Sequence, residues 1–294
     1  MDDADKHFHE GLRLYNLGRY EEAIKEYDKA IAIDPNFKEA HAGKGLALDN
    51  LGRYEEAIKE YDKAIATGLN FKEVHVDKGV ALGNLGRYEE AIKEYDKAIA
   101  IDPNYKEAHY DKGVALGNLG RYEEAIKEYD KVLAIDPNYK GAHYDKGLAL
   151  HVLGRYEEAI KEYDKAIAID PNNEGAHAGK GLALDNLGRY EEAIKEYDKA
   201  IAIDPNYKGA HYDKGVALGN LGRYEEAIKE FDKSLAIDPN YKEAHIARGA
   251  ALHVLGRYEE AIKEYDKVLA IDPNYEIARD GKELALKELK RFKK

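Results

Sequence analysis

Apolar residues recur along the chain with the three- and four-residue spacing of helices, in runs that repeat every 34 positions. Residues 106–139 contain two such runs: first Ala108, Ala115, Leu116 and Leu119, then Tyr122, Ala125, Ile126, Tyr129, Leu133 and Ile135. Gly120 lies where the first helix must stop, a position suited to a left-handed C-cap. Pro137 ends the second helix because proline cannot continue the hydrogen-bond ladder. The pattern predicts two helices in each stretch, each of about 14 residues and ~21 Å long.

The sequence GRYEEAIKE occurs eight times with a constant step of 34 residues, which predicts a repeat protein. Its copies begin at Gly18, Gly52, Gly86, Gly120, Gly154, Gly188, Gly222 and Gly256. The predicted units are 4–37, 38–71, 72–105, 106–139, 140–173, 174–207, 208–241 and 242–275, followed by a tail over 276–294. Residues 40–66 and 176–202, four periods apart, are identical.

Two local features of the fourth unit predict specific details of its first helix. Asn104 precedes the first helix and Glu107 follows three residues later, which predicts a capping box with Asn104 as the N-cap. Gly113 lies inside that helix, where glycine costs about 1 kcal/mol relative to alanine. Close approach of the two helices, with Gly113 facing a small residue such as Ala125, would compensate for that cost.

These positions resemble the tetratricopeptide repeat, a helix–turn–helix unit of 34 residues. The resemblance covers 4–275 and rests on Gly113, Leu116, Ala125, Tyr129, Val132, Pro137 and their equivalents. The family's tryptophan position holds histidine, as at His109. The resemblance implies an all-α solenoid, a right-handed superhelix of antiparallel helix pairs whose first helices line a concave groove. The tail keeps Ala278, Ala285, Leu286, Leu289 and Phe292 at packing positions, which predicts a C-terminal capping helix over 276–294.

Composition narrows the functional classes. The net charge of −12, from 58 acidic and 46 basic residues, argues against a nucleic-acid binder, which presents a basic face. The absence of cysteine excludes disulfides and thiolate sites. No apolar run approaches the ~20 residues of a membrane helix. The N-terminal sequence MDDADKHFHE does not resemble a secretory signal, so we expect a cytoplasmic protein. The abundance of Glu, Lys and Arg suits a thermostable or consensus-like chain.

The first helices vary between repeats at a few positions, those of Glu107, Tyr110, Asp111, Val114, Gly117 and Asn118. By the resemblance these positions face the groove, and they are rich in acidic, aromatic and asparagine side chains. The candidate binding residues are Glu73, Asp77, Asn84, Glu107, Tyr110, Asp111, Asn118, Tyr144, Asp145, Tyr212, Asp213 and Asn220. Grouped carboxylates focus a negative potential, so we expect an extended, neutral-to-basic segment of a protein partner to bind there. The positions that match the family's chaperone-tail clamp hold no Lys or Arg, which argues against acidic chaperone tails.

Two alternatives stay open at this point. Drift at exposed positions would produce the same variation, and the asparagines would then merely help to end the first helices near Gly120. The alternative function is a self-assembling solenoid with an empty groove, because the acidic N-terminus and basic tail favour weak head-to-tail association.

Other chemistry has little support in the sequence. Histidines such as His109 recur once per repeat, but ligands one repeat apart would lie ~8–10 Å from each other. A metal ion needs ligands at ~2 Å, so we expect a packing role and no metal. Lys112 is expected to pair with nearby acids. Ser234 is the single serine, and no nucleophile, phosphate-loop or zinc-protease motif occurs, so we expect neither catalysis nor a cofactor.

Overall fold

The computed structural model describes residues 2–292, and every regular element in that range is an α-helix. The helices are α1 (Asp3–Asn16), α2 (Tyr20–Ile33), α3 (Lys38–Asn50), α4 (Tyr54–Ala66), α5 (Lys72–Asn84), α6 (Tyr88–Ile101), α7 (Lys106–Asn118), α8 (Tyr122–Ile135), α9 (Lys140–Val152), α10 (Tyr156–Ile169), α11 (Glu174–Asn186), α12 (Tyr190–Ile203), α13 (Lys208–Asn220), α14 (Tyr224–Ile237), α15 (Lys242–Val254), α16 (Tyr258–Ile271) and α17 (Glu276–Phe292). They confirm the all-α class and the repeating helix pairs.

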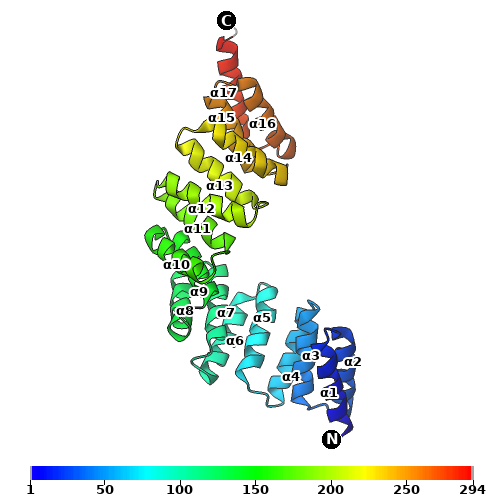
Figure 1. Ribbon diagram of the computed structural model, residues 1–294. Helices are drawn as coiled ribbons and strands as arrows, with labels where there is room; N and C mark the ends of the chain where they lie inside the picture. Colours follow the sequence, from blue (N-terminus) through cyan, green and yellow to red (C-terminus); the bar gives the residue numbers. More distant parts are fainter. Residues whose placement is uncertain (1, 293–294) are drawn as a thin grey trace. The chain divides into compact units, whose positions relative to one another are not determined.

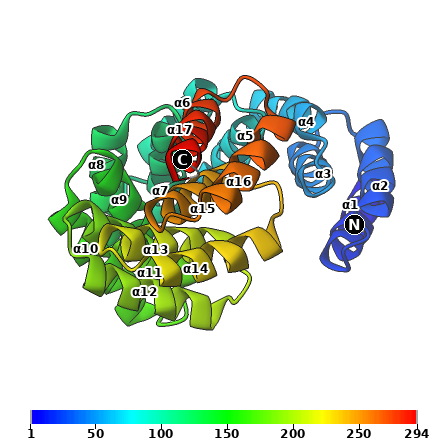
Figure 2. The same cartoon turned by 90° about the horizontal axis from the view of Figure 1, so that it is seen from above.

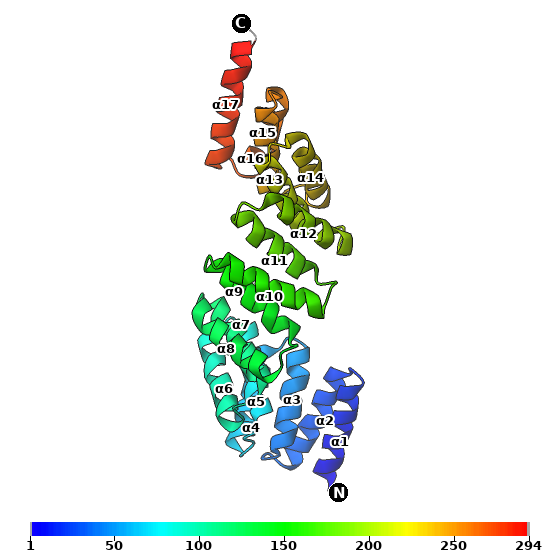
Figure 3. The ribbon, with the colours of Figure 1, turned by 60° about the vertical axis from the view of Figure 1, so that its left-hand side comes forward.

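The helices belong to two compact units, residues 2–149 and residues 150–292. In the first unit α1 packs on α2, α3 on α4, α5 on α6 and α7 on α8 (Figure 1). In the second unit α11 packs on α12, α13 on α14 and α15 on α16, and α17 packs on α16 (Figures 2 and 3). Successive first helices of one unit also touch, as α5 touches α7 and α11 touches α13. The first helices of each unit therefore form a shared face.

The first helices end on left-handed glycines, as the sequence predicts. Gly120 has a φ of +74°, and the N–H of Arg121 donates to the carbonyl of Leu116 at 2.9 Å. This contact satisfies a carbonyl that the end of the helix leaves without a partner. The second repeat uses the same device at the end of its second helix, where Gly68 has a φ of +96° and the N–H of Leu69 donates to Ala64.

The predicted N-cap at Asn104 is wrong. Helix α7 begins at Lys106, so its N-cap is Tyr105, whose side chain makes no capping hydrogen bond. The helix starts one residue later than the capping box requires, and Asp102 engages Asn104 first: the Asn104 N–H donates to Asp102 Oδ1 at 3.0 Å. Asparagine does cap α11, where Asn173 is itself the N-cap and accepts from the Ala176 N–H at 2.9 Å.

The interior glycine allows a close approach, but its neighbour is not the predicted Ala125. A Cβ added to Gly113 would lie 2.5 Å from Cε1 of Tyr129, a ring that is almost fully buried. The tyrosine ring therefore occupies the space that a side chain at position 113 would need. The same pairing recurs between Gly11 and Tyr27 and between Gly181 and Tyr197.

Helix α17 covers the last repeat. Ala278 and Ala285 are fully buried, whereas Leu286 and Leu289 are half-buried. Phe292 is 76% exposed, and its ring lies 5.7 Å from that of Tyr258. Among the described residues no helix is long and apolar enough to cross a membrane.

Candidate functional site

The predicted site residues lie on the first helices. Glu73, Asp77 and Asn84 follow one another at helical spacing along α5, and their equivalents on the adjacent α7 do the same. We call the surface formed by Glu73, Asp77, Asn84, Glu107, Asp111 and Asn118 the first-helix face. Tyr110 of α7 and Tyr144 and Asp145 of α9 belong to the same unit, and Tyr212, Asp213 and Asn220 lie on α13 of the other unit.

The aspartates of the first-helix face are half-buried rather than fully solvated. Burial, reinforced by the charges of Asp49, Glu73 and Asp111, raises the pKa of Asp77 to about 7. Burial and the charge of Glu107 raise the pKa of Asp111 to about 6. A nearby cation would favour the ionised form of each carboxyl. These side chains are therefore suited to exchange a proton for a positively charged group.

The second unit holds an equivalent aspartate. Burial and the charge of Asp185 raise the pKa of Asp213 to about 7. The same environment thus occurs once more, four repeats along the chain.

Two of the predicted tyrosines are engaged within the protein. The hydroxyl of Tyr110 donates to Asp145 Oδ2 at 2.7 Å, and its ring lies 5.0 Å from that of Tyr139. The ring of Tyr212 lies 5.1 Å from that of Tyr241. These rings therefore build the junctions between repeats, and Tyr144 is half-buried on α9.

The asparagines lie in the last turn of the first helices and are exposed. Asn118 Nδ2 donates to the carbonyl of Val114 at 3.0 Å, and Asn186 Nδ2 donates to that of Leu182 at 2.8 Å. These contacts support the alternative that the asparagines help to end the helices. They occupy one amide proton of each side chain and leave its carbonyl oxygen as an acceptor.

A cavity of about 250 Å³ opens on the first-helix face between α5, α6 and α7. It is lined by Val80, Gly83, Asn84, Tyr88, Tyr95, Asp111, Val114, Ala115 and Asn118. A Cβ added to Gly83 would meet only the Tyr95 hydroxyl, at 4.0 Å, so the missing side chain leaves this space open. The cavity brings together three of the predicted residues, Asn84, Asp111 and Asn118.

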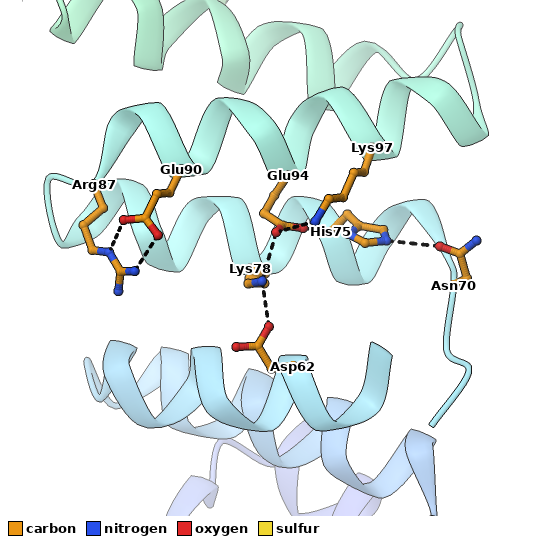
Figure 4. A network of polar contacts seen from close by, with 8 residues as sticks. All are labelled: Asp62, Asn70, His75, Lys78, Arg87, Glu90, Glu94 and Lys97. Atoms are coloured by element: carbon orange, nitrogen blue, oxygen red, sulfur yellow. Dashed lines mark hydrogen bonds and ion pairs between the residues drawn. The ribbon is translucent and has the colours of Figure 1, made fainter. Parts of the chain in front are cut away.

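A buried polar network lies behind this face in the repeats (Figure 4). In the third repeat Glu94 Oε2 lies 2.8 Å from His75 Nδ1, and Glu94 Oε1 lies 2.9 Å from both Lys78 and Lys97. Lys78 also pairs with Asp62 of the preceding repeat at 2.7 Å. The network therefore joins the two helices of one repeat and links that repeat to its neighbour.

The histidine of this network is a hydrogen-bonding residue rather than the simple packing residue that the sequence predicts. His109 Nδ1 lies 2.6 Å from Glu128 Oε2, and its Nε2 lies 3.0 Å from the carbonyl of Pro103. The ring is therefore held from both sides, by a carboxylate of the second helix and by a backbone carbonyl of the preceding turn. Lys112 pairs with Asp96 at 2.7 Å and with Glu128 at 3.4 Å, as predicted.

The buried glutamate, Glu128 in the fourth repeat, is the residue that sequence reasoning missed. A signal was present, because this glutamate directly precedes the core aromatic residue in every copy of the repeat, a tyrosine except at Phe231. Its position 19 residues after the histidine gives no sign of contact until the packing of the two helices is known. Within residues 2–292 no three His, Asp or Glu side chains are grouped so that they could hold a metal ion.

Comparisons with known proteins identify the family. The family model described as TPR repeat matches residues 11–52, 79–120, 118–154, 147–188 and 186–222. Two further models described as tetratricopeptide repeat match residues 212–276 and 38–67. The comparison with curated proteins gives no match.

Several solved structures share the fold. MamA 41-end from Desulfovibrio magneticus RS-1 is 27% identical over 58% of this chain and 96% of its own, with a TM-score of 0.55. YrrB, described as a TPR protein with an unusual peptide-binding site, is 25% identical over 64% of this chain and 97% of its own, with a TM-score of 0.54. A tetratricopeptide repeat protein from Parabacteroides merdae ATCC 43184 is 18% identical over 85% of this chain and 98% of its own, with a TM-score of 0.65.

The fold and the matches agree on one architecture, which supports a protein–protein interaction scaffold; proteins of this kind are typically not catalysts. The family models together account for most of residues 11–276. The chain therefore belongs to the tetratricopeptide repeat family.

Proposed function

We propose that the chain is an interaction scaffold whose first-helix face binds an extended, neutral-to-basic segment of a partner protein. The cavity of about 250 Å³ between α5 and α7 carries this proposal, because it offers room beside the half-buried carboxyl of Asp111. Asn84 and Asn118 line the same cavity and can accept hydrogen bonds from an extended backbone.

Electrostatics favour a basic segment over an acidic one. The charges of Asp49, Glu73 and Asp111 all act on Asp77, so negative charge is concentrated along α3, α5 and α7. Two opposite unit charges 4 Å apart attract by about 4 kcal/mol at an effective dielectric constant of 20. An acidic peptide would meet repulsion of the same order.

A random-peptide array tests the proposal. We expect the wild type to select basic peptides at low salt and to lose them at high salt, because the attraction is screened. The variant Asp77→Lys/Asp111→Lys/Asp145→Lys should lose these peptides at either salt concentration. The matched control is Glu55→Lys/Glu89→Lys/Glu123→Lys, which makes the same nominal charge change at exposed positions of α4, α6 and α8 and should keep binding.

The selected peptides should bind more tightly as the pH rises from about 5 to about 8. A cation requires ionised carboxyls, and the pKa values of Asp77 and Asp111 lie at about 7 and about 6 without a ligand. Below those values the peptide must displace protons, so the affinity falls. If the wild type binds nothing, or the variant and the wild type bind alike, the proposal is wrong. The self-assembling alternative, which the exposed Ile277 and Leu284 of α17 favour, would then explain the chain better.

A further inference from the structure

At two junctions between repeats, carboxyl groups from two successive first helices both act electrostatically on one buried tyrosine. In the first unit the charges of Asp77 of α5 and Asp49 of α3 both act on Tyr61 of α4. In the second unit the charges of Asp213 and Asp185 act on Tyr197 in the same way. We call Asp49, Tyr61 and Asp77 the first acid-pair site, and Asp185, Tyr197 and Asp213 the second.

Each of the other junctions lacks one or both of the two acids. The position of Asp49 is glycine at Gly83, Gly117 and Gly219, and histidine at His151 and His253. The position of Asp77 is glycine at Gly43 and Gly179 and alanine at Ala247. The two acid-pair sites are therefore distinct from the remaining repeats, and they recur four repeats apart.

Buried polar atoms in both sites have no partner. The side chain of Tyr61 is 0% exposed, and neither its hydroxyl nor the buried Asp49 Oδ1 makes a hydrogen bond. The hydroxyl of Tyr197, also 0% exposed, and Asp185 Oδ1 are unpaired in the same way. A buried polar group without a partner destabilises the folded state, so the same unpaired set at two places points to a ligand that supplies donors.

The chemistry of that ligand follows from the groups present. Two carboxyls and a hydroxyl form a site rich in acceptors, which favours a cation with several N–H donors. Arginine carries five N–H donors in a rigid planar fork, whereas lysine presents a compact ammonium with three. Since Asp49 and Asp77 come from different helices and are both half-buried, a fork that donates in two directions suits them better.

We infer that each acid-pair site binds one arginine side chain. The first site takes an arginine of a segment held on the first-helix face, and the second site takes an arginine of a segment held on α11 and α13 of the other unit. The inference rests on the proposed function and adds to it the side chain recognised and the two places where it is recognised. The exposed parts of the half-buried aspartates are accessible to the arginine side chain, and the buried tyrosine hydroxyl of each site is a further acceptor.

A short peptide measures the number of sites directly. We expect two molecules of the peptide acetyl-Ala-Asn-Ala-Arg-Ala-Asn-Ala-amide to bind each full chain at least tenfold more tightly than any further peptide molecules. Calorimetry at pH 8 and low salt measures the number of tight sites, which we call tight equivalents. Asp49→Asn should remove one of these equivalents, and Asp49→Asn/Asp185→Asn should remove both. The peptide with lysine in place of arginine should bind at least threefold more weakly, and the peptide with alanine there should not bind.

A gain of binding separates the inference from a general attraction to negative charge. Gly83→Asp adds the missing acid opposite Asp111 and Tyr95, where the added Cβ meets only a hydroxyl at 4.0 Å, and should create a third tight equivalent. Gly219→Asp is the matched control, because its Cβ has nothing within 4 Å but its junction holds Ala247 and Phe231, which offer neither carboxyl nor hydroxyl. It should add no tight equivalent.

The outcomes distinguish this inference from the proposed function. The inference is overturned if Asp49→Asn/Asp185→Asn still binds two peptides tightly, or if both glycine variants gain a third tight site equally. In either case, selection of basic peptides on the array would still support binding at the first-helix face. Failure of the wild type to bind the arginine peptide would also overturn the inference. Loss of basic-peptide selection from the array would overturn the proposed function itself.

Discussion

Replacing Glu94 by alanine is expected to lower the free energy of unfolding by about 3–5 kcal/mol, the usual cost of removing one partner of a buried ion pair. Glu94 is 5% exposed and faces His75, Lys78 and Lys97 (Figure 4). Without the glutamate, the buried His75 loses its partner at Nδ1 and keeps Asn70 at Nε2, and Lys78 keeps its pairing with Asp62. Urea unfolding followed by circular dichroism measures the loss.

The matched control is Glu90→Ala on the same helix. Glu90 is exposed and pairs with the exposed Arg87 at 2.6 Å, an arrangement worth about 0–1 kcal/mol. Equal losses for Glu90→Ala and Glu94→Ala would show that the buried network does not stabilise the fold.

The loss of stability caused by Glu94→Ala should become smaller at acidic pH. Burial alone would raise the pKa of Glu94, but hydrogen bonds from His75, Lys97 and Lys78 outweigh burial and lower it to about 2. A carboxyl whose pKa is lowered by folding stabilises the folded state fully at a pH above its pKa in the unfolded chain, about 4.3. This contribution is lost as the pH falls through the pKa in the folded state, about 2. The difference between wild type and variant should therefore decrease between pH 4.5 and pH 2.

Replacing Gly113 by alanine is expected to destabilise the protein by about 1–3 kcal/mol, the range for overpacking a core. Alanine favours a helix over glycine by about 1 kcal/mol, so propensity alone predicts the opposite sign. The added Cβ would lie 2.5 Å from the buried Tyr129 ring, which must move. Thermal and urea unfolding of the variant decide between the two effects.

Gly117→Ala is the control on the same helix, because its Cβ has nothing within 4 Å. It should leave the stability unchanged or raise it by up to about 1 kcal/mol. The double variant Gly113→Ala/Tyr129→Leu should recover part of the stability lost by Gly113→Ala alone. A Gly113→Ala protein as stable as the wild type would refute the close contact with the ring.

The helix pairs and their ends could be predicted because the signals are local. Apolar spacing defines the helices, and Gly120 and Pro137 stop them through their own backbone properties. The cap at Asn104 was wrong because the start of α7 shifted by one residue and Asp102 offered Asn104 another contact. For Gly113 the physical reason, a close approach, was right, but the partner depends on helix rotation, which the sequence does not specify.

The sequence predicted where the candidate site residues lie on the helices better than it predicted how buried and how charged their surroundings are. The variable positions placed Asp77 and Asp111 on the first helices, where the structure has them. Their half-burial and the raised pKa values arise from contacts between repeats, which a single repeat does not reveal. The same holds for the pair His109 and Glu128, whose contact spans two helices.

A crystal structure of the chain with the basic peptide selected most strongly by the array tests the central claim most directly. We predict that the peptide lies extended along α5 and α7, with a basic nitrogen about 2.7–3.2 Å from a carboxylate oxygen of Asp77 or Asp111. Its backbone should face Asn84 and Asn118. A peptide bound on the second helices or at the ends of the chain, with the first-helix face empty, would contradict the account.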